Sequence, residues 1–421
     1  MLCSLIYMSL VFAIYLSATS TGLNVMTQIF EQKGYDYLGN ISIFTIFLFG
    51  MIGNFVCILY IRKLQYRHSF FIHSLGYLLF LISGLLVCNC ADKEGGMCNS
   101  FWIYLITIIS SAISGFTSSG LFITQNDYVA QLSKQSKKAG LYYGIAWAVL
   151  QISQVIGSLY SAFIIVQIKQ FYFYCLMVAV ATFGSLSFLF VSQPKQHTQS
   201  IIQLQEDDKE VSNNEEMNKL NPISVILTMK EFRVKCFIFP MMITGCLLSF
   251  QWNVMHYIIE NSIDTQLLSD EEITKYTLLV MTVLGCCEVL GGIFIGVFNT
   301  YTPKYTSQLL QFHLISIALL LAIINTYEQK YGICFLIAIL WGLVDCGTTS
   351  TLLAIIAQDW NDQIQYFGLF NFLQCCGGMI STIISIILSQ QPIEWSIFFL
   401  LICVCASKFS ISCYQKLYIK Q

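Results

Sequence analysis

Charged side chains are scarce in this sequence: Asp, Glu, Lys and Arg make up 10% of its 421 residues, whereas hydrophobic residues make up 56%. Soluble globular proteins carry about 25% charged residues, and a soluble core cannot absorb this much apolar surface. The apolar residues form separate runs of about 20, the length at which a helix spans the hydrocarbon of a bilayer. The runs lack the alternation of membrane strands. We therefore predict an all-α polytopic membrane protein that lies in a lipid bilayer.

Motifs for catalysis and nucleotide binding are also absent. The sequence contains no GxxxxGKS/T, HExxH or GxSxG pattern, and the close glycines of GCCEVLGGIFIG stand inside an apolar run, where they serve helix packing. The formal net charge is −2 and no basic patch occurs, so nothing indicates a nucleic-acid partner. We expect no enzyme activity and no cofactor.

Most of the 17 cysteines stand inside apolar runs, where Cys acts as a small hydrophobic residue. One cluster, Cys88, Cys90 and Cys98, lies near a predicted loop in the segment CNCADKEGGMC. No His is nearby and the spacing is not a paired CxxC, so we expect no metal site. The cluster could form a disulfide if its loop faces an oxidising compartment.

We predict twelve membrane spans. They lie near residues 2–20, 38–61, 69–90, 100–124, 139–165, 170–192, 236–258, 276–298, 307–326, 331–357, 364–389 and 393–413. The first run, MLCSLIYMSLVFAIYLSATS, could instead be a cleaved signal peptide, because SATS resembles a cleavage site. It lacks the positively charged start of a signal peptide, so we expect a retained first helix.

The Lys and Arg residues are distributed unevenly among the connectors. With both termini on the cytoplasmic side, sixteen of the 21 basic residues lie inside and five outside, namely Lys33, Lys93, Lys169, Lys275 and Lys330. This bias agrees with the positive-inside rule. We therefore predict cytoplasmic termini, while the plasma membrane and an endomembrane both stay open.

A long polar stretch divides the spans into six and six. It begins QPKQHTQSIIQLQEDDKEVSNNEEMNKLNPISV and this part contains no aromatic residue, which is typical of a flexible linker. We predict a six-helix bundle over 1–192, a cytoplasmic linker over 193–235 and a second six-helix bundle over 236–421. This plan resembles that of major facilitator transporters, in which two bundles enclose a cavity.

A partial repeat supports the two halves. The segment YYGIAWAVLQISQVIGSLYS, from residue 142, resembles YFGLFNFLQCCGGMISTI, from residue 366. Both begin with Tyr, an aromatic residue and Gly, and both place a Gln about two turns later, at Gln151 and Gln374. The segments are the fifth and eleventh spans, which hold equivalent places in the two halves.

The fifth span carries two stripes of polar or small residues. One consists of Gly144, Trp147, Gln151, Gln154 and Ser158, and the other of Ser153, Gly157 and Ser161, each at helical spacing. The second stripe has the small-xxx-small spacing that lets helices approach closely. The Gln residues either bond to a neighbouring helix or line a cavity that contacts substrate.

Two carboxyls are predicted to lie deep in the membrane. Asp345 is near the middle of the tenth span and Glu288 near the middle of the eighth, and no Lys or Arg stands at that depth. The sequence leaves open hydrogen bonds to polar neighbours, a neutral protonated carboxyl or a bound cation. The last two favour a coupling role in the transport of H⁺ or another cation.

The seventh span contains a polar-aromatic patch toward its outer end. It comprises Gln251, Trp252, Asn253 and His256, and Pro240 in the same span is expected to kink the helix. We include Gln251 among the candidate cavity residues.

Several segments resemble the uncoordinated-93 family of the major facilitator superfamily. The fifth span is similar to that family's pattern YFGxFFxxFQSSQVxGNL, with matches at Tyr142, Gly144, Gln151, Ser153, Gln154, Val155, Gly157 and Leu159. LWGLVDCGTTSTLLA resembles the family's tenth-span pattern at Trp341, Gly342 and Asp345, and YFGLFNFLQCCGG resembles its eleventh span. The turn IRKLQYRH lacks the Gly and Asp of the facilitator signature at that place, which puts a standard gating latch in doubt.

The resemblance implies a twelve-span facilitator fold and two functions. Some members of the family look like regulatory subunits of potassium channels, and another escorts nucleic-acid-sensing receptors between membranes. We therefore expect a regulator of an ion channel or of receptor trafficking, whose partner is a channel or receptor membrane protein. The alternative is a secondary transporter of a small solute that is coupled to H⁺ or another cation, which Asp345, Glu288 and the Gln stripe favour.

Overall fold

The computed structural model describes most of the chain in detail. The described residues are 2–35, 37–61, 63–90, 96–134, 138–164, 168, 170–194, 228–263, 268–360, 363–388 and 392–418. Most of the predicted linker, residues 195–227, lies outside the described residues. Twelve helices within the described ranges are long and apolar enough to span a membrane, which confirms the predicted twelve-span, all-helical fold.

The elements follow one another without a strand in the described ranges. In chain order they are α1 (Leu2–Gln32), α2 (Leu38–Ile61), α3 (Tyr66–Cys90), η1 (Gly96–Cys98), α4 (Ser100–Lys134), α5 (Ala139–Ile164), α6 (Gln170–Ser187), η2 (Phe188–Phe190), α9 (Phe232–Lys235), α10 (Ile238–Ser249), η4 (Phe250–Val254), α11 (Met255–Glu260), α12 (Asp270–Tyr301), α13 (Lys304–Glu328), α14 (Tyr331–Asp359), α15 (Gln363–Ile387) and α16 (Glu394–Tyr418).

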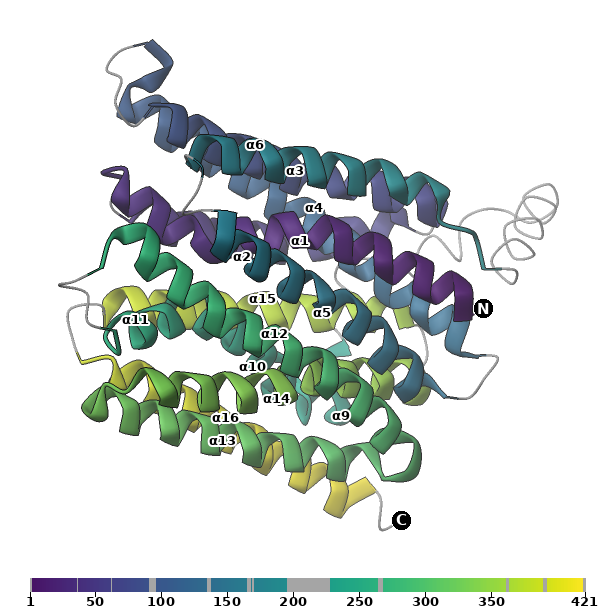
Figure 1. Cartoon of the computed structure of the whole chain (residues 1–421). Coiled ribbons are helices and arrows are strands. Elements are labelled where there is room, and N and C mark those ends of the chain that lie inside the picture. The colour runs from purple at the N-terminus through teal and green to yellow at the C-terminus, as the bar shows by residue number, and fades with distance from the viewer. Residues whose placement is uncertain are drawn as a thin grey trace, which may run out of the picture.

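The helices form two groups that lie side by side. Figure 1 shows α1 to α6, in purple to teal, on one side and the green to yellow helices on the other, with α2, α5, α12 and α15 between them. Both ends of the chain lie at the same end of the bundle (Figure 1). We call this the linker end, because residues 191–194 and 228–231 also lie there, and the opposite end the distal end.

Apolar side chains cover the outside of the bundle as well as its core. On α3 the side chains of Leu75, Leu79 and Ile82 are 38%, 44% and 43% exposed, and they recur at helical spacing. In a bilayer such a face is covered by lipid, whose tails are as apolar as the side chains themselves. The outward faces therefore agree with the membrane class that the composition predicts.

Several helices extend beyond the predicted spans. The helix predicted to end at residue 20 continues to Gln32, and the one predicted to end at residue 124 continues to Lys134. The eighth span begins earlier than predicted, at Asp270, after the N-cap Ser269, whose side chain forms a capping box with Glu272. Hydropathy marks only the apolar part of a helix, so the polar turns at its ends were missed.

The seventh span is interrupted in its distal half. A π-helical turn, η4, separates α10 from α11, and such turns occur frequently at functional sites. Pro240 lies in the first turn of α10, where the backbone N–H groups have no helical partner in any case. Pro240 therefore does not kink the helix, and the irregularity lies at residues 250–254 instead.

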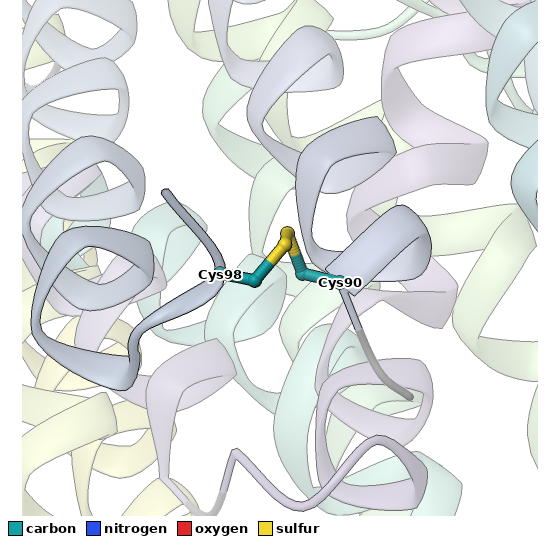
Figure 2. Close-up of a disulfide and its surroundings, with 2 residues drawn as sticks. All are labelled: Cys90 and Cys98. Carbon is teal, nitrogen blue, oxygen red and sulfur yellow. A yellow bond between two sulfur atoms is a disulfide. The ribbon is translucent and has the colours of Figure 1, made fainter. Parts of the chain in front are cut away.

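One disulfide closes the distal connection between α3 and α4. Cys90, the last residue of α3, is bonded to Cys98 in η1, eight residues later (Figure 2). Cys88 is a free, half-buried thiol. Of the three cysteines that the sequence groups together, the structure thus joins the second and the third.

We expect the Cys90–Cys98 bond to stabilise the protein in an oxidising compartment. Because it closes a loop with a sequence separation of 8, Cys90→Ser should lower the free energy of unfolding by about 2 to 3 kcal/mol. Thermal unfolding in detergent measures this change. Reductant should lower the midpoint of the wild type and of the control Cys88→Ser but not that of Cys90→Ser; equal sensitivity of all three proteins would contradict the assignment.

Candidate functional site

The two membrane carboxyls of the sequence meet between α12 and α14. Glu288 and Asp345 are 1% and 5% exposed, and their side chains are hydrogen-bonded to each other. Two glycines permit this approach. A Cβ added to Gly291 would lie 2.4 Å from the carbonyl oxygen of Leu343, and one added to Gly342 would lie 2.3 Å from that of Leu284. The backbones are therefore in direct contact on either side of the pair.

A hydrogen bond between two carboxyls requires a proton, because two carboxylates have no donor between them. None of the ion pairs among the described residues includes Glu288 or Asp345, and Oε2 of Glu288 has no hydrogen-bond partner there. If both groups ionised, their like charges would repel; for a separation of about 4 Å this costs about 4 kcal/mol at an effective dielectric constant of about 20. The geometry allows the pair to share one proton.

A cavity of about 440 Å³ opens at the distal end. Its lining comes from the distal ends of α1, α2, α11, α13, α15 and α16, from η4 and from the segment between α15 and α16, and it combines polar with apolar side chains. The lining residues are Glu31, Tyr37, Asn40, Asn253, Val254, Tyr257, Asn261, Thr326, Thr382, Ser385, Ile386, Leu388, Pro392, Ile393, Glu394 and Ser396. A volume of this size suits a small solute.

The π-helical turn connects the cavity, the carboxyl pair and the other half of the molecule. Asn253 of this turn lines the cavity, and Phe250 stacks on Trp341 with ring centroids 4.5 Å apart. Trp341 lies one helical turn before Asp345 on the same face of α14. Trp252 stacks on Phe47 of α2 at 5.7 Å. A rearrangement of this turn would therefore change the lining of the cavity, the Phe250–Trp341 stack beside Asp345 and the Trp252–Phe47 contact with the other half.

The two halves are closed against each other toward the linker end. Gly144 of α5 faces α12 so closely that an added Cβ would lie 2.6 Å from the carbonyl oxygen of Gly292 and from Cα of Gly296. A second contact between the halves joins Phe55 of α2 and Phe372 of α15, whose ring centroids are 4.7 Å apart. Combined with the distal cavity, this arrangement is a distal-open, linker-closed state.

The predicted Gln residues have different surroundings. Gln154 is buried, donates to Ser158 at 3.3 Å on its own helix and lies beside Gly285 of α12. Gln151 and Gln374 are half-buried, and Gln251 is 4% exposed in η4 with its Oε1 unpaired among the described residues. None of the four lines the distal cavity. Their role as substrate contacts stays a prediction.

The small residues of α5 face two different neighbours. Gly144 faces α12, whereas an added Cβ on Gly157 would lie 2.1 Å from Oγ1 of Thr21 and 2.6 Å from the carbonyl oxygen of Ser17, both on α1. Ser153 and Ser161 are 2% and 0% exposed. The helix thus uses small residues to approach both the opposite half and its own.

The linker end carries the same contact in both halves. Tyr66, at the start of α3, donates to Asp127 of α4 at 2.5 Å, and Tyr305, near the start of α13, donates to Asp359 at the end of α14 at 2.9 Å. Tyr66 belongs to the segment IRKLQYRH, which lacks the Gly and Asp of the facilitator signature. A hydrogen bond between a tyrosine and a carboxyl group is therefore present in this segment.

We expect Tyr66→Phe to destabilise the linker end. Asp127 is 4% exposed, so removal of its donor leaves a buried carboxyl with less hydrogen bonding and should lower the free energy of unfolding by about 1.5 to 3 kcal/mol. Thermal unfolding measures the change, and Tyr142→Phe, at a half-buried position, is the control. Equal midpoints for the wild type and Tyr66→Phe would show that the bond contributes nothing.

The sequence interpretation missed the acidic residues of the cavity. Glu31 and Glu394 lie at the ends of spans rather than inside them, so a search for ionisable residues within apolar runs passes over them. The excess of acidic residues in the distal connectors is the signal that could have identified them. Asn253 belongs to the patch that the seventh span does show.

Comparisons with known proteins agree with this geometry. A family model described as Major Facilitator Superfamily matches residues 8–382. The chain belongs to the major facilitator superfamily. No curated protein matches the sequence, and the likeness to the uncoordinated-93 subfamily stays a prediction.

Two solved structures of the superfamily are similar to this facilitator. One is described as a major facilitator transporter, FucP, in the outward conformation; it is 13% identical, with a TM-score of 0.66 over 97% of this chain and 98% of that one. The other is described as the proton:xylose symporter XylE bound to 6-bromo-6-deoxy-D-glucose; it is also 13% identical, with a TM-score of 0.64 over 99% and 94% of the two chains. At this identity the likeness concerns the fold alone.

Proposed function

We propose that this facilitator is a secondary transporter that couples the movement of a small solute to H⁺. The observation that carries the proposal is the hydrogen-bonded pair Glu288–Asp345, buried between α12 and α14 and connected through Trp341, Phe250 and η4 to a distal cavity. Ionisable residues inside membrane helices commonly mark proton relays. XylE, a structural neighbour that is 13% identical, is described as a proton symporter, which is compatible with this chemistry.

The position of Glu288 on α12 suggests when the proton leaves. Gly285 of the same helix faces α5, Gly291 faces α14, and Gly292 contacts both helices, so Glu288 lies between these two neighbours. While the linker end is closed, the carboxyl pair is buried and keeps its proton. Separation of α5 from α12 would admit water from the linker end to the carboxyl pair. Ionisation of the pair costs less free energy in contact with water than in the closed interior.

The regulatory role that the uncoordinated-93 resemblance implies stays a second prediction. No contact among the described residues supports it, whereas the carboxyl pair supports transport. Co-purification from membranes tests it: recovery of no other membrane protein would count against a channel or receptor partner.

Uptake into proteoliposomes tests the transporter proposal. Purified protein would be given a panel of radiolabelled solutes (a hexose, a polyol, an amino acid, a monocarboxylate, choline and putrescine) with the membrane potential clamped at zero. We expect at least one solute to accumulate under a proton gradient of one orientation, and an ionophore that collapses the gradient to abolish this. Uptake no greater than in protein-free liposomes, for every solute and both orientations, would refute the proposal.

A further inference from the structure

We propose that His73 binds a proton from the linker side and thereby releases α2 from α3 and α4. This role goes beyond solute transport, because the transport mechanism proposed above does not use His73. The residue lies in α3, in the half formed by α1 to α6, and is 1% exposed. Histidine is the side chain whose charge ordinarily changes between about pH 5 and 8, so it is the residue type that responds to mild acid.

The hydrogen bonds of His73 define its tautomer. Nδ1 lies 2.7 Å from the carbonyl oxygen of Ser69, and because a carbonyl oxygen can only accept, Nδ1 carries the hydrogen. In the neutral ring Nε2 then has the lone pair, and it accepts a hydrogen bond from the Tyr60 hydroxyl at 2.8 Å. Both ring nitrogens are therefore satisfied while His73 is neutral.

A proton on Nε2 would reverse the bond between His73 and Tyr60. Nε2 would become a donor, so the Tyr60 hydroxyl would have to accept from it and direct its own hydrogen elsewhere. The structure offers Sγ of Cys57, which lies 3.2 Å from the Tyr60 oxygen, but sulfur is a weak acceptor. Protonation therefore makes the Tyr60 hydroxyl exchange a nitrogen acceptor for a weaker sulfur acceptor.

A charged His73 ring would also lack a counter-charge in this arrangement. The titratable groups that face the ring are Cys57 and Tyr60 of α2, whereas α4 presents Gly120, where an added Cβ would overlap the imidazole. Among the described residues no carboxyl is hydrogen-bonded or ion-paired to His73. Burial of an unpaired cation is unfavourable, so the proton binds preferentially once α2 or α4 has moved away and water reaches the ring. By linkage, acid favours the released arrangement.

His73 stands at the inner end of a row of contacts between α3 and α4. In order from the linker end, the contacts are Tyr66–Asp127, Ser69–Thr124 and His73–Gly120. Seven residues of helix, about 10 Å, separate Tyr66 from His73, and the carboxyl of Asp127 is already bonded to Tyr66. A proton from the linker side therefore has two contacts to pass before it reaches the ring.

The helix that would be released also contacts the other half of the molecule. Ile58 of α2 packs against Gly368 of α15, where an added Cβ would overlap its side chain. Nδ2 of Asn54 lies 3.9 Å from Sγ of Cys375 on the same two helices. Displacement of α2 would therefore weaken a contact that holds the two halves together.

Hydrogen exchange at two pH values tests the release of α2. Protection factors, which are corrected for the intrinsic effect of pH on exchange, would be compared at about pH 7.5 and about pH 5.5 for peptides from the linker-side halves of α2 and α3. We expect them to fall at least about tenfold on acidification of the wild type, because one proton taken up per opening changes the opening equilibrium by up to about tenfold per pH unit. In His73→Gln they should fall by less than about twofold, since Gln keeps an acceptor for Tyr60 but does not titrate.

The control variant is His313→Gln. Nδ1 of His313 also lies 2.7 Å from a carbonyl oxygen, that of Leu309, but this histidine is exposed on α13, so the variant should keep the pH response of the wild type. Size-exclusion profiles would verify that both variants fold. Wild-type protection that does not change with pH, or an equal loss of the response in both variants, would overturn the proposal. An unchanged response in His73→Gln would assign the effect to other groups, such as the carboxyl pair, and would overturn it as well.

A spectroscopic measurement decides the question if His73→Gln does not fold. The chain has five histidines, so replacement of the other four by Gln leaves His73 as the single histidine, whose ring would be labelled with ¹⁵N. We expect NMR in nanodiscs to show the neutral ring with its hydrogen on Nδ1 at about pH 7.5, and the doubly protonated ring over the pH range in which protection falls. A neutral ring with its hydrogen on Nε2, or a ring that stays neutral down to about pH 5, would contradict the proposal.

Discussion

In Asp345→Asn we expect proton-driven accumulation to disappear while the protein still folds and exchanges solute. Asn keeps the size of Asp and can donate a hydrogen bond to Glu288, but it does not titrate. For one-to-one coupling, a gradient of about two pH units supports an accumulation of about 100-fold, since each factor of ten corresponds to about 1.4 kcal/mol. The accumulation ratio of the variant should fall to about one. Uptake at clamped zero membrane potential measures it, for the solute that the wild type accumulates.

Solute exchange without a gradient provides the internal control. The variant should retain counterflow, in which labelled solute enters against unlabelled solute inside, because binding and reorientation do not require the proton step. Glu288→Gln should behave in the same way, since both residues belong to one pair. Gradient-driven accumulation by Asp345→Asn equal to that of the wild type would remove Asp345 from the coupling mechanism.

In Gly144→Leu we expect the distal-open state to be lost. The atoms that an added Cβ would meet at 2.6 Å belong to the backbone of Gly292 and Gly296, so no flexible side chain can move aside. The halves would have to separate at the linker end. Hydrogen exchange of peptides from α5 and the linker-end half of α12 should become faster by about tenfold or more, because each lost 1.4 kcal/mol of protection is a factor of ten.

The matched control for this substitution is Gly332→Leu. A Cβ at Gly332, the second residue of α14, would meet no atom within 4 Å, so this leucine adds the same volume without a clash. Its exchange pattern and solute uptake should equal those of the wild type. If Gly144→Leu also behaved like the wild type, the contact between α5 and α12 would not be what keeps the linker end closed.

The twelve spans could be predicted from the sequence because the thickness of the hydrocarbon fixes the length of an apolar helix. The same property limits the prediction at helix ends, where α1 and α4 continue for a turn or more into polar sequence. The interruption at η4 could not be predicted, since FQWNV contains no residue that requires a π-helical turn. Pro240, the obvious candidate for a kink, lies where proline is harmless.

The candidate site was predictable only in part. Asp345 and Glu288 each stood out as carboxyls at membrane depth, but their meeting depends on which helices are neighbours, and apolar runs carry little information about that. The glycines that create the contact, Gly291 and Gly342, resemble many others in the chain. Glu31 and Glu394 are 363 positions apart in the sequence, and only the fold brings them to one cavity.

The close contact between α5 and α12 also bears on how fast such a molecule can work. Its closest points are Gly144, Gly292 and Gly296, residues without side chains that could interlock. When leucines or arginines part and meet again, each loses up to about 2 kcal/mol of rotamer freedom on re-association, whereas glycine and alanine lose none. Opening and closing at this place therefore demands little reordering. The contact can therefore separate and re-form repeatedly with little loss of side-chain entropy in each cycle.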